Sequence, residues 1–423
     1  MNSTPDRAGE SGAFAARHAL GWLAVANGIG VWLAALLLWP DLGRLAGDVT
    51  YGRWVPLHLN LQLYGWTSLP LIGWLFAIYG VDRSSTVSWA PSVIRAWSAA
   101  LVVGAAFWLS GHTSGKLFLD WKSGSLAAFM IAQVLLWGLL ATAWWNDSRA
   151  GALRLATFLG LIVLAMVPPG LWIAASPSSY PPIDVTTGGP TGGSLLGSTL
   201  PVVLLLLWTP RVVGLDRDEA TPRWITWLWV GEALAFVVLE RFGGTHRMLR
   251  QIGGLGLLLP WLMVVPRDWR HFQWPNGARF WKNSALVWWI VLIIAGWLEY
   301  LPGVLDRMKF TSGLVAHAHL AMAGFTSSFG LLLITLTGGA AARQAISRGG
   351  RCWHLAVAAH VIALLVCGWL EGGSTSWMDH RPAWREVAFL VRLSSGVVMA
   401  GLAVYWWLRS FADSDSSPEF PNT

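Results

Sequence analysis

The sequence predicts an all-α integral membrane protein, and three observations lead to that fold class. Hydrophobic residues make up 55% of the 423 residues and charged residues only 12%, which is far fewer charges than a soluble protein of this length carries. Apolar runs of roughly 20 residues, long enough to cross a bilayer, recur along the whole chain. The 31 tryptophans fit this class, because tryptophan is enriched where helices meet lipid headgroups.

Twelve apolar segments are candidate membrane spans. They are residues 18–40, 55–80, 93–112, 122–146, 152–176, 194–210, 222–241, 252–267, 283–303, 312–337, 353–371 and 386–409. The longest polar connection, residues 176–193, predicts an irregular loop between spans five and six. We therefore predict a membrane domain over residues 1–411, a twelve-helix bundle, and a polar, disordered tail over 412–423. We find no repeats and no separate soluble domain.

Charge and cysteine content exclude several function classes. The net charge of +7 is spread over short loops, which indicates membrane topology and not a nucleic-acid-binding surface. The two cysteines, Cys352 and Cys367, form neither a CxxCH nor a CxxC motif. We therefore expect neither covalently attached c-type haem nor an iron–sulfur or zinc cluster, and we predict that both cysteines are structural.

The distribution of Lys and Arg predicts the orientation. With the N-terminus in the cytoplasm, 17 of the 29 cations lie on the inner side and 11 on the outer side, and Arg392 lies within span twelve. Because short cytoplasmic loops are enriched in cations, we predict a multi-pass protein of the inner (cytoplasmic) membrane with both termini in the cytoplasm. The first apolar run is too long for a signal peptide, so we expect the N-terminus to be retained.

Three histidines inside the predicted spans are the strongest sign of function, because ionisable residues are costly in lipid. His58 near the start of span two, and His317 and His319 near the start of span ten, are predicted to lie at a similar depth in the outer part of the bilayer. Residues two apart on a helix point roughly 200° apart, so His317 and His319 cannot bind one small ion together. Imidazole is a common axial ligand of haem iron, and we predict one haem on each side of this helix, with His58 across one of them. The alternative is that the histidines are hydrogen-bonded inside the bundle, and this is our prediction for His354 and His360 in the inner half of span eleven.

Four segments carry a family resemblance: "HLNLQLYGW" from His58, "TSGKLFLDW" (113–121), "LEYLPGVLDRMKFTSGLVAHAHLAMAGF" with Glu299, and "FLVRLSSGVVMAGLAVYWW" from Phe389. With them the chain resembles subunit I of the haem–copper oxidase superfamily, which has twelve spans. It is most similar to the cbb-type cytochrome c oxidases and the related nitric oxide reductases. The resemblance implies two b-type haems: His58 and His319 would be the axial ligands of a low-spin haem iron, and His317 would bind the iron of a second haem.

The sequence departs from this family where the family holds a second metal. Active members bind copper or non-haem iron through one histidine in span six and two adjacent histidines at the end of span seven. Span six here contains no histidine, Ser198 being the nearest match, and the end of span seven, "RFGGTHRML", keeps only His246. One imidazole does not hold copper against its competitors, so we expect no copper. His246 would then be a sixth ligand of the second haem, or that haem would be five-coordinate or would bind water or a gas.

Charged residues near the predicted haems add further candidates. Glu232 and Glu299 are proton-path candidates, because a carboxyl group buried in a span is usually functional. Arg381 and Arg385 lie in an outer loop and could bind haem propionates, since arginine binds carboxylates through two hydrogen bonds. Ordinary loop charge is the alternative for both arginines.

The sequence thus predicts a membrane di-haem b protein that transfers electrons or binds a gas within a respiratory complex. Its predicted partners are other respiratory membrane subunits, among them a cytochrome c or copper-containing subunit, and the lipid bilayer, with no nucleic acid. Two alternatives stay open. One is a divergent but active terminal oxidase or nitric oxide reductase that uses Glu232, Glu240 and His246. The other is a haem-free transporter or structural subunit on the same scaffold.

Overall fold

The described part of the chain is helical. The computed structural model describes residues 9–47, 49–147, 151–178, 195–242, 248–378, 380 and 382–412. Across these residues there is no β-sheet, only an isolated antiparallel bridge between Arg217 and Phe272. The predicted all-α class is therefore confirmed.

Nine helical segments in the described residues are long and apolar enough to cross a membrane. They are Glu10–Leu38, Tyr51–Tyr79, Val87–Leu109, Ser123–Trp145, Leu153–Ala175, Asn276–Glu299, Ser312–Thr337, Gly350–Glu371 and Ala383–Arg409. Each overlaps one of the predicted spans, so the prediction of a multi-pass membrane protein is confirmed. The count of twelve spans stays a prediction.

The other three predicted spans are largely helical in their described residues. Span six corresponds to α8 (Leu195–Val212), within which Leu200–Val212 is a shorter apolar helix, and span seven corresponds to α9 (Arg223–Phe242). The segment predicted as span eight is divided between α10 (Met248–Gly256) and α11 (Trp261–Arg270). Pro260, which has no N–H group to continue a helix, lies between them.

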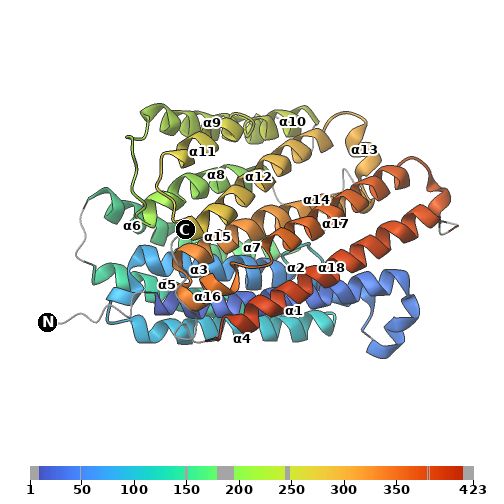
Figure 1. Cartoon of the computed structure of the whole chain (residues 1–423), viewed down its shortest axis with the longest axis horizontal. Coiled ribbons are helices and arrows are strands. Elements are labelled where there is room, and N and C mark those ends of the chain that lie inside the picture. The colour runs from blue at the N-terminus through green and yellow to red at the C-terminus, as the bar shows by residue number, and fades with distance from the viewer. Residues whose placement is uncertain are drawn as a thin grey trace. The chain divides into compact units, whose positions relative to one another are not determined.

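The chain divides into two compact units, and each is described by itself. The first unit comprises Met1–Tyr180, Gly330–Ala356 and Gly396–Thr423, and the second comprises Pro181–Phe329 and Val357–Ser395. In the first unit, α1 (Glu10–Leu38) packs against most of its neighbours (Figure 1). The other helices there are η2 (Pro40–Ala46), α2 (Tyr51–Asn60), α3 (Ser68–Tyr79), η4 (Val81–Arg83), η5 (Val87–Trp89), α4 (Ala90–Leu109), α5 (Ser123–Trp145), α6 (Ala152–Ala165), α7 (Val167–Ala175) and α16 (Gly339–Ala345).

A carboxylate fixes the start of α1. Asp82 accepts hydrogen bonds from the backbone N–H groups of Gly9 (3.0 Å) and Ser11 (3.1 Å). These N–H groups have no partner within the helix, and negative charge is favourable at a helix N-terminus. Asp82 therefore ties the loop after α3 to the first helix.

In the second unit, α12 (Asn276–Glu299) is the helix on which most others pack. It contacts α10, α11, α13 (Val304–Met308) and α14 (Ser312–His319). The second unit also contains α8, α9 and η7 (Thr375–Met378). Three helices are divided between the units: α15 (Ser327–Thr337), α17 (Gly350–Glu371) and α18 (Ala383–Arg409).

Two spans contain a π-helical segment, and both carry predicted ligands. The segment η3 (Leu61–Thr67) follows α2, which carries His58, and η6 (Leu320–Thr326) follows α14. These two spans are also the most buried, at 61% and 67% of their apolar windows against 44% or less for the other seven. Because π-helical segments occur frequently at functional sites, the fold directs attention to these two spans.

Candidate functional site

His58 is held by the main chain of α1. Its Nδ1 lies 2.9 Å from the carbonyl oxygen of Ala26. A carbonyl only accepts hydrogen bonds, so Nδ1 carries the proton and the lone pair of the neutral ring is on Nε2. The ring packs on Gly30, where an added Cβ would lie 2.8 Å from His58 Cε1. Because Gly30 has no side chain, the imidazole ring of His58 can pack directly against α1 there.

The helix that carries the histidine pair is fixed at its first turn. Thr311 caps α14 by accepting a hydrogen bond from the N–H of Gly313 at 3.1 Å. Glu371, at the end of α17, accepts a second from the N–H of Ser312 at 2.7 Å. Gly368 brings the two backbones together, since a Cβ there would lie 2.6 Å from the Cα of Gly313. The start of α14 is therefore bound tightly to α17.

His319 has the same anchoring as His58 and an imidazole neighbour. Its Nδ1 lies 2.8 Å from the carbonyl oxygen of Val315, which again places the lone pair on Nε2. Its ring lies against that of His360 on α17, with centroids 4.4 Å apart and planes tilted by 31°. We predicted that His360 lies in the inner half of its span, away from the predicted haem ligands, and its contact with His319 shows that this was wrong. His360 is 4% exposed, and its Nδ1 is 3.0 Å from Ser395 Oγ.

His317 faces a different helix. Its Nδ1 lies 3.2 Å from Glu299 Oε2 at the end of α12, within the distance of an ion pair but without the angle of a hydrogen bond. The ring packs on Gly296, where a Cβ would lie 3.0 Å from His317 Cε1. His317 therefore contacts α12 while His319 contacts α17. The prediction that the two histidines face apart is confirmed.

The surroundings of His58 and of His317 share one local design. Each histidine precedes its π-helical segment by three residues, in "HLNLQLYGWTS" and "HAHLAMAGFTS". Each segment contains a glycine that packs on a tryptophan: Cβ atoms at Gly65 and Gly324 would lie 2.9 Å from Trp22 and Trp288. In this correspondence Asn60 takes the place of His319.

Asn60 belongs to a buried polar cluster that sequence reasoning missed. Its side chain is fully buried, and Nδ2 donates to Asp120 Oδ2 (2.8 Å) and to the carbonyl of Pro56 (2.7 Å). Asp120, in the loop after α4, is 3% exposed, and burial raises its pKa to about 6. Lys116 in the same loop is 2% exposed and donates to the carbonyl oxygens of Ala174 and Ser176 at the end of α7. The only sequence signal was their place within the quoted segment "TSGKLFLDW".

Several predicted site residues lie elsewhere or outside the described residues. His246 and Arg381 are outside them, as is the side chain of Glu240. Arg385 donates through Nε to Glu371 Oε1 at 3.0 Å, and its predicted role with a propionate stays a prediction. Glu232 is 7% exposed and accepts a hydrogen bond from Trp261 Nε1, which leaves its predicted proton-path role open.

His58 and His319 are the residues whose orientation could serve a metal-containing cofactor. Neutral imidazoles with Nδ1–H held by a carbonyl present Nε2, the atom through which histidine commonly binds haem iron. No three His, Cys, Asp or Glu side chains come together as a metal site in the part of the chain that is described. Oriented imidazoles on buried spans would suit a large flat ligand whose other contacts are apolar. No family model matches the chain, and no curated protein is significantly similar to it.

Proposed function

We propose that this chain is an integral membrane protein that binds two b-type haems and transfers electrons or binds a gas within a respiratory complex. The observation that carries the proposal is the anchoring of His58 and His319. Each Nδ1 is held by a main-chain carbonyl, and each neutral ring therefore presents its lone pair on Nε2. This is the arrangement that axial haem ligands require. In the proposal both would bind the low-spin haem iron.

His317 would bind the second haem iron. The group beside its Nδ1 is the carboxyl group of Glu299, whereas His58 and His319 each lie beside a main-chain carbonyl. Glu299 Oε2 lies 3.2 Å from His317 Nδ1, and a hydrogen bond formed there when haem is bound would make the imidazole a stronger electron donor than a carbonyl partner does. Glu299 would thus act on the ligand as well as being a candidate for the proton path. Bound haem would supply reversible one-electron transfer and, where one axial position stays open, a place for a small gas.

We propose no copper site, and we infer the partner subunits from the source of electrons that the haems would require. One predicted copper-site histidine, His246, remains in the sequence, and one imidazole does not retain copper. The chain contains no CxxCH motif for its own cytochrome c. Electrons would come from another membrane subunit, one that carries a cytochrome c or a copper centre, at the inner membrane.

The test is optical and EPR spectroscopy of the purified chain, with haem and metal quantified per protein. We expect haem b without stoichiometric copper. His58→Ala and His319→Ala should each remove the low-spin signal, and His317→Ala should remove the second haem. His354→Ala serves as the matched control and should leave both. A colourless protein, or one copper ion per chain, would contradict the proposal, and turnover of oxygen or nitric oxide would favour the enzyme alternative.

A further inference from the structure

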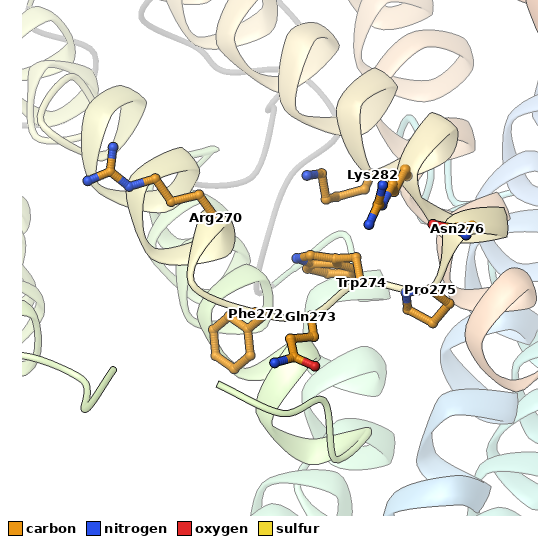
Figure 2. Close-up of a pocket in the computed structure, with 8 residues that line it drawn as sticks. Arg270, Phe272, Gln273, Trp274, Pro275, Asn276 and Lys282 are labelled. Carbon is orange, nitrogen blue, oxygen red and sulfur yellow. The ribbon is translucent and has the colours of Figure 1, made fainter. Parts of the chain in front are cut away.

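A groove lined by cations lies at the start of α12, within the second unit. Its volume is about 740 Å³, and Arg270, Trp274, Asn276, Arg279 and Lys282 are among the residues that line it. We call it the basic groove. Figure 2 shows Trp274 in its middle, with Lys282 on one side and the guanidinium of Arg270 directed away. None of the residues proposed to bind haem contributes to it.

Among the described residues, the cations of the groove form no ion pair. Elsewhere in the second unit, Arg211 and Arg217 both bind the buried carboxylate of Asp268, at 2.9 and 2.7 Å. In contrast, no ion pair within the described residues includes any of the three groove cations. No Asp or Glu lines the groove either. The groove therefore carries uncompensated positive charge.

The helix that begins there adds to this charge. The first residue of α12 is Asn276, and no side chain caps that end. The N–H groups of a first helical turn have no partners within the helix and carry partial positive charge. Anions bind readily at such ends when cations lie beside them.

The floor of the groove is rigid and aromatic. Trp274 is 6% exposed, and its Nε1 donates to the carbonyl oxygen of Trp269 at 2.8 Å. Lys282 Nζ lies 5.9 Å from the centre of the indole ring. The ammonium group of Lys282 thus lies near the indole ring of Trp274, on the side of the groove where an anion would bind.

The position of the groove indicates the kind of anion. It lies at the beginning of the candidate membrane span Asn276–Glu299, and the ends of such spans meet the lipid headgroups. Large apolar side chains are exposed nearby on the same elements, Phe280 at 40% and Met263 at 55%. A phosphate next to exposed apolar surface is the chemistry of a phospholipid, and basic pockets beside membrane helices bind such headgroups.

We propose that the basic groove binds the headgroup phosphate of an anionic phospholipid. Arg279 and Lys282 neutralise the phosphate, the N-terminus of α12 adds hydrogen-bond donors, and the acyl chains lie along the exposed apolar side chains of α11 and α12. The lipid thereby holds the start of the helix that bears Glu299 and packs on α14.

The experiment uses the purified, delipidated full chain in detergent and native mass spectrometry. The probes are phosphatidylglycerol, phosphatidylcholine and inorganic phosphate. We expect saturable binding of phosphatidylglycerol, and binding about 30-fold weaker in the double variant R279Q/K282Q, because each cation beside an anionic headgroup contributes roughly fivefold. The control is R343Q/R351Q, which removes two exposed cations from the first unit and should bind as the unaltered chain does.

Each other outcome overturns the proposal. Equal weakening in both double variants would mean that net charge alone attracts the lipid. Binding of inorganic phosphate as tight as that of phosphatidylglycerol would make the groove a phosphate site. Equal binding of phosphatidylcholine, or no binding of phosphatidylglycerol by a chain whose circular dichroism shows it folded, would leave no anionic-lipid site.

Discussion

The regions around His58 and His317 have the same local framework but different chemistry. Both place a histidine against a glycine of the preceding long helix, Gly30 or Gly296, and both continue into a π-helical segment. Two residues after the first histidine, however, one region has Asn60 and the other has His319. One framework therefore presents one imidazole in the first unit and two in the second.

The partners of the histidines differ as well. His58 is bound by a carbonyl of α1, whereas His317 lies beside the carboxylate of Glu299. Asn60 is enclosed by Asp120 and Pro56, and His319 by Val315 and His360. The comparison teaches that the backbone design sets where a donor sits, while the residues packed around it set whether that donor can be a ligand.

Replacing His319 with the residue of the other region should have the largest effect. We expect His319→Asn to lose about half of the bound haem, because in the proposed function the low-spin haem iron would lose one of its two axial ligands. A haem assay and the visible spectrum measure this. His354→Asn is the control, and an unchanged spectrum in His319→Asn would mean that the second region does not differ in function from the first.

The buried carboxyl group beside Asn60 should make stability depend on pH. Burial raises the folded-state pKa of Asp120 from 3.8 to about 6, so the unfolded chain releases this proton first as pH rises. The stability that Asp120 contributes is then fully present below about pH 4 and is lost as pH rises towards 6, a loss of at most about 3 kcal/mol. Asp120→Asn should remove this loss. Thermal unfolding in detergent between pH 4 and 8 checks it, and an identical pH profile in the variant would refute it.

The paired glycines test whether the two regions share a framework. Gly65→Ala and Gly324→Ala should each destabilise the protein by about 1–3 kcal/mol, because the added methyl group overlaps a tryptophan. Gly28→Ala is the control, since nothing lies within 4 Å of a Cβ there. It should be neutral or stabilising, as alanine favours a helix. Effects of unlike size at the two glycines would break the correspondence.

The smallest effect is expected at two matched serines. Ser68 Oγ donates to the carbonyl of Leu63 at 3.0 Å, and Ser327 Oγ donates to that of Met322 at 2.8 Å. Each satisfies a carbonyl of a π-helical segment. Ser68→Ala and Ser327→Ala should each cost about 1 kcal/mol in thermal unfolding. A loss confined to one of them would show that only one segment needs this bond.

Sequence reasoning found the histidines and their opposite directions, because helical geometry alone sets the angle between neighbouring positions. It missed the contact between His319 and His360, because depth was counted along each span as if all spans began at one level. Glu371 at the end of α17 lies beside Ser312 at the start of α14, and that offset brings His360 to His319. Asp120 was missed because nothing in a loop sequence shows that the loop is buried.

The π-helical segments also bear on how such a protein can change. A π-helical turn contains one more residue than the α-helical turn it replaces. Deleting a single residue within Leu61–Thr67 would therefore restore an α-helical turn and leave the parts on either side facing as before. The same deletion in an α-helical part of the span would rotate one side by about 100° and could turn the imidazole away from Gly30 and Ala26. The two π-helical segments are thus places where a span can lose a residue and keep the direction of its histidine.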